Sequence, residues 1–167
     1  MNIIPYEPPM RQAALGLALR AWKPVFPQLK AAVPGFVYGA FYPEEWQKRQ
    51  LSDLGQILDN EPNTVDVAML QGQNGSEKPQ LAGWVCTRIH PEDSMGEVYI
   101  LAVDPQFQRR GIGHALMNHS HDRARAAGMT MMMVETGGDP GHAPARHTYE
   151  AAGYQRWPVA RYFKNLQ

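Results

Sequence analysis

The sequence predicts a mixed fold of the α/β (α+β) class, in which helices cover a single sheet. Three observations support this prediction. Short apolar runs typical of strands are interleaved with longer segments of helical composition. The 167 residues match the size of one ordinary domain, which we expect to span residues 1–167. The content of 44% apolar and 19% charged residues is that of a globular protein.

The first third of the chain is predicted to contain two helices, at residues 10–22 and 43–60. The second should begin with Pro43, Glu44 and Glu45 in its first turn, where acidic groups suit the helix dipole. Between them lies the aromatic stretch Pro34-Gly-Phe-Val-Tyr-Gly-Ala-Phe-Tyr-Pro43. We interpret it either as a lid over an acceptor or as an ordinary packed loop, because aromatic faces accept apolar groups, sugars and cations alike.

Strands dominate the middle of the chain, and helices and strands alternate after it. Three strands are predicted at residues 65–70, 81–89 and 97–103, with the hairpin loop 71–79 after the first. The remaining predicted elements are a helix at 111–127 ended by Gly128, a buried strand at 129–135, a helix at 143–152 ended by Gly153, and a final strand at 154–164 interrupted by Pro158.

Charge and cysteine content narrow the classes of partner and compartment. Sixteen basic residues balance sixteen acidic ones, so no overall field attracts nucleic acid or anionic lipid. The N-terminus lacks the pattern of a signal peptide, and no apolar run reaches membrane-spanning length. The single cysteine, Cys86, lies in an apolar strand and is expected to pack in the core rather than act as a catalytic thiol. These observations favour the cytoplasm.

The segment Leu101-Ala-Val-Asp-Pro-Gln-Phe-Gln-Arg-Arg-Gly-Ile-Gly-His114 joins a predicted strand to a predicted helix and has the features of an anion site. Gly111 and Gly113 let the backbone approach a ligand closely. The first N–H groups of a helix have no partner within the helix, so they can hold a phosphate, and Arg109 and Arg110 add positive charge. The P-loop and Rossmann fingerprints do not fit, because His114 follows Gly113 and Leu116 stands where a third glycine would be required.

The spacing Gln108-x-x-Gly111-x-Gly113 after a Val-Asp-Pro strand end resembles the acetyl-coenzyme A loop of the GNAT acyltransferase superfamily. A second block, Ala145-Arg-His-Thr-Tyr-Glu-Ala-Ala-Gly-Tyr154, is similar to the late helix of that family, in which a tyrosine precedes a Gly-aromatic pair. The resemblance runs from about residue 96 to 154. One position departs from it, because His142 stands seven residues before Tyr149, where the family often has asparagine.

The resemblance implies a mixed, mostly antiparallel sheet with a splayed central parallel pair, flanked by helices. It implies that acetyl-CoA is the co-substrate and that no metal is needed. The residues that it assigns to the cofactor are Leu101, Ala102, Val103, Gln108, Arg109, Arg110, Gly111, Ile112, Gly113, His114 and Tyr149. Backbone groups of 101–103 would pair with the pantetheine arm as an added strand does, and an N–H nearby could polarise the thioester carbonyl.

The resemblance also suggests the acid and the base. Only about one in a few thousand lysine-like amines is uncharged at neutral pH, so the enzyme must remove a proton. Glu97, at the start of a strand, resembles the base of several family members, and Glu135 at the end of the next strand is the competing candidate. Tyr149 matches the position of the acid that protonates the departing thiolate.

Other residue patterns are better explained by structure than by metal chemistry. His119 and His121 are two positions apart on a predicted helix and should face different directions. The run Met129-Thr-Met-Met-Met133 is explained by burial in a central strand. We therefore assign no metal.

Three functions follow. The first is N-acetylation of a small-molecule primary amine, with an aminoglycoside-type antibiotic among the candidates, for which Glu97, Glu135 and Asp139 could contribute to an acidic acceptor site. The second is acetylation of a peptide or protein at its N-terminus or at lysine. The third is a non-catalytic acyl-CoA-binding module. The sequence leaves the protein as either a monomer or a homodimer.

Overall fold

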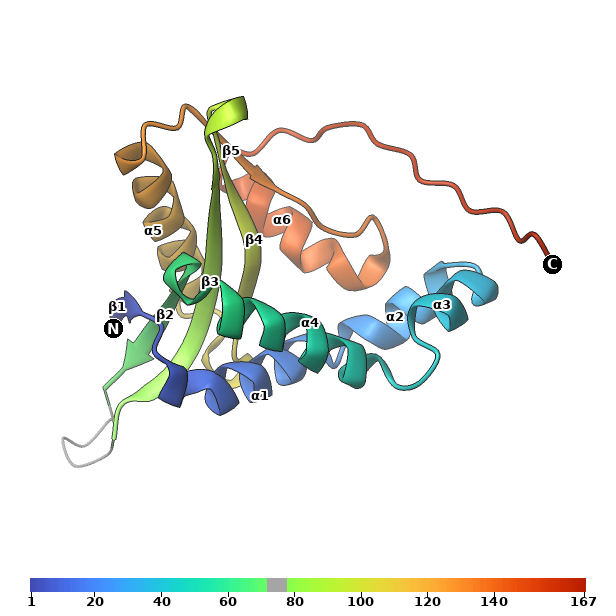
Figure 1. Ribbon diagram of the computed structural model, residues 1–167, viewed down its shortest axis with the longest axis horizontal. Helices are drawn as coiled ribbons and strands as arrows, with labels where there is room; N and C mark the ends of the chain where they lie inside the picture. The colour runs from blue at the N-terminus through green and yellow to red at the C-terminus, as the bar shows by residue number, and fades with distance from the viewer. Residues whose placement is uncertain (72–77) are drawn as a thin grey trace.

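A computed structural model describes residues 1–71 and 78–167 and contains a five-stranded sheet in the order β1-β2-β3-β4-β5 (Figure 1). Antiparallel pairing joins β1 through β4, whereas β4 and β5 are parallel. The strands are β1 (Asn2–Pro5), β2 (Val65–Leu70), β3 (Gln80–His90), β4 (Met95–Val103) and β5 (Met131–Val134). This mostly antiparallel sheet with one parallel pair confirms the predicted fold class. The predicted loop 71–79 falls mainly on residues 72–77, outside the described residues.

Six α-helices accompany the sheet in the described residues, and four of them were predicted. They are α1 (Arg11–Trp22), α2 (Val25–Ala32), α3 (Gly35–Phe41), α4 (Trp46–Asn60), α5 (Ile112–Ala126) and α6 (Ala143–Ala151). Short 3₁₀ turns connect elements at η1 (Pro8–Met10), η2 (Pro62–Thr64), η3 (Pro91–Asp93), η4 (Pro105–Phe107) and η5 (Pro140–His142). Within residues 1–71 and 78–167, no helix combines the length and apolar character needed to cross a membrane.

Two predictions for the N-terminal third were wrong. The segment 34–43 is not a loop, because most of it forms α3, which aromatic packing stabilises despite two glycines. Helix α4 begins at Trp46, so Pro43, Glu44 and Glu45 precede its first turn. Glu44 instead accepts a hydrogen bond from Lys48 at 2.6 Å, one turn further along.

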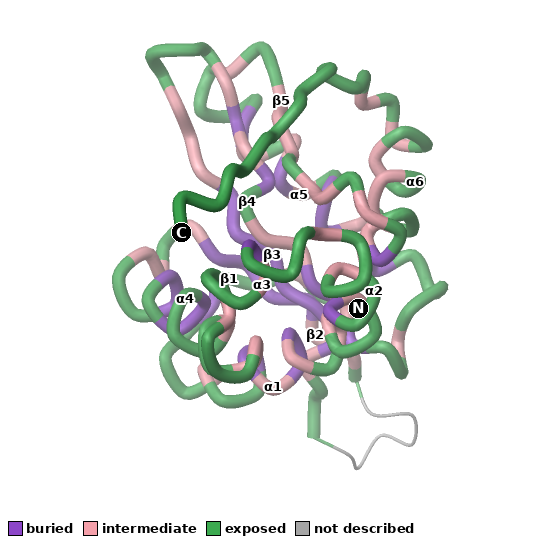
Figure 2. Tube along the Cα trace, turned by 90° about the vertical axis from the view of Figure 1, so that its right-hand side faces the viewer, coloured by how far each residue is buried: buried purple, intermediate pink, exposed green. Residues whose placement is uncertain are grey.

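Helices on both faces of the sheet enclose two apolar clusters. On one face, α1 and α4 pack against β2 and β3 around Trp84, which is fully buried. On the other face, Ile112 and Leu116 of α5 pack against Val85 and Val98. The indole Nε1 of Trp84 donates a hydrogen bond to the carbonyl oxygen of Ala14 at 3.1 Å, which ties β3 to α1. Figure 2 shows the buried residues concentrated along the central strands.

The C-terminal part differs from its prediction. The expected strand at 154–164 is absent, since residues 154–167 have no regular structure and residues 155–167 are exposed (Figure 2). A strand requires a partner strand, and this segment pairs with none among the described residues; its contacts include the ion pair of Arg156 with Glu150. Consequently β5 ends the sheet in the described part of the chain rather than lying centrally, and Met131 is 51% exposed rather than buried.

We predict that Trp84→Phe destabilises the protein by about 2 kcal/mol, because it leaves a cavity and removes the donor that satisfies the Ala14 carbonyl. Trp157→Phe is the matched control, since Trp157 is 82% exposed, and it should leave stability unchanged. Denaturant unfolding followed by circular dichroism measures both. Equal effects of the two substitutions would contradict the proposed role of Trp84.

Candidate active site

The parallel pair β4–β5 separates part of the way along β4. Their register runs from Met95↔Met131 to Val98↔Val134 and stops, whereas β3 continues to pair with β4 as far as Val103. The β3–β4 register also shifts, because Cys86 pairs with Ile100 and Thr87 pairs with Val98, so Tyr99 is the extra residue of a bulge. Within the described residues, the β5-facing edge of β4 from Tyr99 to Val103 has no strand partner, so its backbone groups can pair with an extended ligand.

The loop after β4 reaches α5 through two residues with left-handed backbone conformation. Arg109 has φ of 62° and Gly111, the N-cap of α5, has φ of 78°. Glycine adopts this region without strain, which explains the choice of residue at 111. A Cβ built on Gly113 meets Val103 at 3.6 Å, an ordinary contact distance, so the start of α5 is not crowded. The exposed N-terminus of α5 thus offers unpaired N–H groups to an anion.

The predicted cofactor residues of this loop differ in the exposure of their side chains. Gln108, Arg109, Arg110 and His114 are exposed, and Gln108 donates its side-chain amide to the carbonyl oxygen of Val103 at 3.2 Å. In contrast, the side chain of Ile112 is only 2% exposed and packs in the core against β3 and β4. Any contact of Ile112 with a ligand must therefore come from its backbone.

Helix α6 carries Tyr149 and ends as predicted. Gly153 has φ of 88°, and the N–H of Tyr154 donates to the carbonyl oxygen of Tyr149 at 3.1 Å, as in a Schellman cap. Tyr154 then hydrogen-bonds His121 of α5 at 2.8 Å. Burial raises the pKa of the Tyr149 phenol above its ordinary value, so this hydroxyl keeps its proton at neutral pH.

The segment that joins β5 to α6 is held by its own side chains. Asp139 caps η5, accepting a hydrogen bond from the Gly141 N–H at 2.9 Å, and it binds Nδ1 of His142 at 2.6 Å. Arg146 donates to the carbonyl oxygens of Gly137 and Asp139 at 2.5 and 2.8 Å. His142, which replaces the usual asparagine, is therefore held by a carboxylate.

Glu97 lies on β4 one residue before the parallel pairing ends, and its side chain is 13% exposed. Nε2 of His90 hydrogen-bonds Oε2 of Glu97 at 2.8 Å. This bond raises the pKa of the His90 imidazole above its ordinary value, so the charged imidazole that pairs with Glu97 is present in mildly acidic solution and is lost as the pH rises through that raised pKa. The sequence interpretation missed His90, although the β3–β4 hairpin that brings it to Glu97 was recognisable.

Glu135, the competing candidate for the base, and Asp139 lie in surroundings that differ from those of Glu97. The Glu135 side chain is 73% exposed and lies 3.3 Å from Arg161. The Asp139 side chain is 6% exposed and pairs with His142. Glu97, Glu135 and Asp139 each have a basic partner already, so they do not form an open acidic cluster of the kind that a polycation would need.

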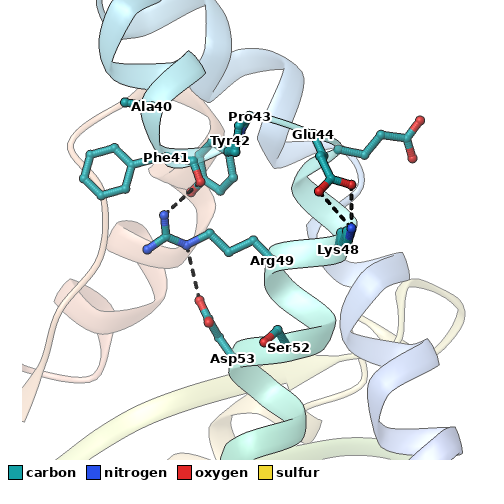
Figure 3. A pocket seen from close by; sticks show the side chains of 10 residues that line it. Ala40, Phe41, Tyr42, Pro43, Glu44, Lys48, Arg49, Ser52 and Asp53 are labelled. Atoms are coloured by element: carbon teal, nitrogen blue, oxygen red, sulfur yellow. Dashed lines mark hydrogen bonds and ion pairs between the residues drawn. The ribbon is translucent and has the colours of Figure 1, made fainter.

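A pocket is lined by residues of α3, of the connection from α3 to α4, and of the first half of α4 (Figure 3). Arg49 occupies its centre, donating to the carbonyl oxygen of Phe41 at 2.8 Å and pairing with Asp53 at 3.4 Å. Its guanidinium also lies 5.0 Å from the ring centroid of Phe41. Figure 1 places α3 well away from the start of α5, so this pocket is separate from the glycine loop.

His119, His121 and Cys86 each have a structural explanation. His119 lies 3.1 Å from the buried Asp66, which Arg123 also binds, while His121 binds Tyr154. Cys86 is fully buried, and this burial raises the pKa of its thiol, as expected for core packing. In the part of the chain that the structure describes, no three His, Cys, Asp or Glu residues come together as metal ligands.

A bulged strand that splays from its parallel neighbour and leads into a glycine-rich helix start is the acyltransferase architecture that the sequence resemblance implies. A sequence profile of the acetyltransferase (GNAT) family matches residues 36–154. The chain therefore belongs to the GNAT family of acetyltransferases.

Among curated relatives, mycothiol acetyltransferase of Rhodococcus opacus (strain B4) is 27% identical over 148 residues, which are 85% of this chain. They are 47% of that relative, so the chain spans less than half of its length.

Solved structures share the fold. The aminoglycoside antibiotic 6'-N-acetyltransferase of Acinetobacter haemolyticus has a TM-score of 0.62 at 14% identity, covering 99% of this chain and 98% of that one. The ribosomal-protein-S18-alanine N-acetyltransferase of Escherichia coli has a TM-score of 0.57 at 23% identity, covering 99% and 84%. These two proteins have different acceptors, so the shared fold does not identify the acceptor of this chain.

We predict that Gly113→Asp removes the thermal stabilisation that acetyl-CoA confers, because a carboxylate at the helix start repels the pyrophosphate. In the wild type, ligand at one hundred times its Kd should stabilise the fold by about 2.7 kcal/mol. The ligand-free variant should fold normally, because Asp suits a helix N-terminus. Gly113→Asn is the uncharged control and should keep part of the shift. A full acetyl-CoA shift in Gly113→Asp would show that the anion site is misplaced.

Proposed function

We propose that this chain is an acetyl-CoA-dependent N-acetyltransferase that acetylates a primary amine of a small molecule. One observation carries the proposal. A single strand, β4, holds Glu97 beside the point where β5 diverges, then offers an unpaired edge, and then leads into the glycine loop. The proposed base, the edge for pantetheine and the site for pyrophosphate therefore follow one another along the chain.

The described residues fit acetyl-CoA in two places. The N–H groups of Gly111, Ile112 and Gly113 suit the pyrophosphate. Their neighbours in sequence include four exposed polar or basic residues, Gln108, Arg109, Arg110 and His114. Backbone groups of Leu101, Ala102 and Val103 suit the amides of pantetheine, although the Val103 carbonyl already accepts a hydrogen bond from Gln108. Acetyl-CoA supplies the acetyl group as an activated thioester.

We assign the base to Glu97 rather than to Glu135. Glu97 is mostly buried next to the diverging strands and keeps Oε1 for an acceptor while Oε2 binds His90. Glu135 is largely exposed and close to a cation. In this proposal Glu97 takes a proton from the acceptor ammonium, and the Tyr149 hydroxyl donates its proton to the departing thiolate.

The acceptor is proposed to be a small amine. The name of the curated relative, a mycothiol acetyltransferase, and the acetylated antibiotics of the fold neighbour support this size class. A strongly polycationic aminoglycoside is less well supported by the site, because its candidate carboxylates are paired. We further propose one domain over residues 1–167, as a monomer or a homodimer in the cytoplasm, without nucleic acid or membrane partners.

Thiol release from acetyl-CoA tests the proposal directly. Aminoglycosides, polyamines, amino acids, amino sugars and short peptides are offered in turn to the purified chain. Turnover of a small amine with no turnover of peptides supports the proposed function. Turnover of peptides alone assigns the chain to protein acetylation, and tight acetyl-CoA binding without any turnover assigns it to a non-catalytic binding module.

We predict that Tyr149→Phe lowers kcat by about ten-fold and leaves the affinity for acetyl-CoA unchanged, since the hydroxyl acts on the leaving group rather than on binding. The raised pKa of Tyr149 keeps it protonated through neutral pH, so the loss should be uniform there. Tyr162→Phe is the control, because Tyr162 is 90% exposed. An unchanged kcat would return Tyr149 to a packing role.

We predict that Glu97→Gln lowers turnover about 10²-fold at neutral pH and less above the pKa of the acceptor amine, where free amine is already abundant. Glutamine keeps the shape of the side chain but cannot take the proton. Glu135→Gln is the matched control and should keep the wild-type pH profile. If the profile changes in Glu135→Gln and not in Glu97→Gln, the base is Glu135; a higher KM with an unchanged profile in Glu97→Gln would mean that Glu97 only binds the acceptor.

A further inference from the structure

Asp104 stands at the junction between β4 and the glycine loop, and its side chain is 3% exposed. Both carboxylate oxygens have partners. Oδ1 accepts a hydrogen bond from the backbone N–H of Gln106 at 3.1 Å and so caps η4. Oδ2 accepts two hydrogen bonds from Arg20, from Nε at 3.0 Å and from Nη2 at 2.5 Å. The carboxylate thus joins the loop to α1, 84 positions earlier in the chain.

The backbone of Asp104 is held as firmly as its side chain. Its N–H donates to the carbonyl oxygen of Ala82 on β3 at 2.9 Å, and its own carbonyl oxygen accepts from the N–H of Phe107 at 2.8 Å. Asp104 therefore fixes the direction in which the chain leaves the sheet. Arg109, Arg110 and Gly111 follow within seven residues, so their placement depends on this anchor.

The charge of Asp104 makes Arg20 important for any anion that the loop binds. A buried carboxylate is costly unless a cation and hydrogen bonds satisfy it. An uncompensated negative charge just before the loop would also repel a pyrophosphate. The Arg20 guanidinium removes both difficulties, because it neutralises the carboxylate and supplies two donors in fixed geometry.

We infer that Arg20 is a positioning residue for coenzyme A, acting through Asp104 to hold and neutralise the start of the pyrophosphate loop. The inference rests on the proposed function, since it takes coenzyme A as the ligand of this loop. It adds a residue of α1, outside the strand and helix that carry the glycine motif. The spacing of Arg20 and Asp104 in sequence gave no indication of their pairing.

The test compares the Kd for coenzyme A, measured by calorimetry well below the unfolding temperature, with thermal stability. Arg20→Gln should raise the Kd at least about ten-fold, equivalent to about 1.4 kcal/mol, and should lower stability. Adding Asp104→Asn removes the buried charge and keeps a capping side chain. The double variant should regain most of the stability and the part of the affinity lost to charge repulsion, but its Kd should stay above the wild-type value because the link to α1 is still missing.

Two further variants separate positioning from general stabilisation. Arg11→Gln is the matched control, since Arg11 is also on α1 and makes two hydrogen bonds to a carboxylate, that of Asp59, at 2.7 and 2.8 Å. It should leave the Kd for coenzyme A unchanged. Arg20→Lys keeps the charge without the two-donor fork and should have an intermediate Kd. With an acceptor in hand, Arg20→Gln should raise the KM for acetyl-CoA and leave kcat near the wild-type value.

The outcomes are distinct. A wild-type Kd in Arg20→Gln overturns the inference. A Kd that returns fully to the wild-type value in the double variant also overturns it, because Arg20 would then neutralise Asp104 without positioning the loop. If wild-type protein does not bind coenzyme A, the proposed function itself fails, and the inference fails with it; binding by the wild type with no effect of Arg20→Gln rejects the inference alone.

Discussion

The unequal lengths of the two pairings of β4 determine the architecture of the proposed site. On one side β3 pairs with β4 as far as Val103, while on the other side β5 pairs with it only as far as Val98. Backbone N–H and C=O groups need partners, so the remaining edge of β4 favours an extended ligand with amides. The bulge at Tyr99 lies where the two strands part, and it increases the local twist of β4. The positions of the proposed base and of the glycine loop both follow from this strand.

Paired charges connect the sheet to helices that are distant in the chain. Asp104 pairs with Arg20 of α1, and Asp66 on β2 pairs with Arg123 of α5. Each carboxylate is almost completely buried, so removing its cation would leave an unsatisfied charge. On the face covered by α1, the Arg20–Asp104 pair supplements the hydrogen bond of Trp84. On the face covered by α5, the Arg123–Asp66 pair supplements the packing of Leu116. The sheet is therefore held to its helices by charge as well as by apolar contact.

Helices α2, α3 and α4 pack on one another through aromatic residues. Phe26 of α2 stacks on Trp46 of α4 with ring centroids 4.1 Å apart, and Tyr42 approaches Phe26 edge-on at 5.3 Å. These contacts bury aromatic surface that a loop would leave exposed. The guanidinium of Arg49 lies 5.0 Å from the ring centroid of Phe41 and 5.7 Å from that of Tyr42, so both rings have a cationic neighbour.

Local patterns determined much of the fold. The strand at 65–70 was predicted with its observed bounds, and the helix ends at Gly128 and Gly153 were correct, because glycine in the left-handed region is a local signal. The spacing in the loop 108–113 identified the family for the same reason. The short helices α2 and α3 escaped prediction, since aromatic contacts from other elements stabilise them. The failure of 154–164 to form a strand is equally nonlocal, because a strand exists only where a partner is available.

The sequence by itself determined the class of fold, the order of most elements and the loop proposed to hold pyrophosphate, all of which depend on neighbours within a few positions. Tertiary structure decided which side chains meet. It placed His90 against Glu97, His142 against Asp139, and Arg20 against Asp104, and it left Glu135 exposed. The free energy of such pairs depends on distance and burial in space, which the separation of residues along a chain does not specify.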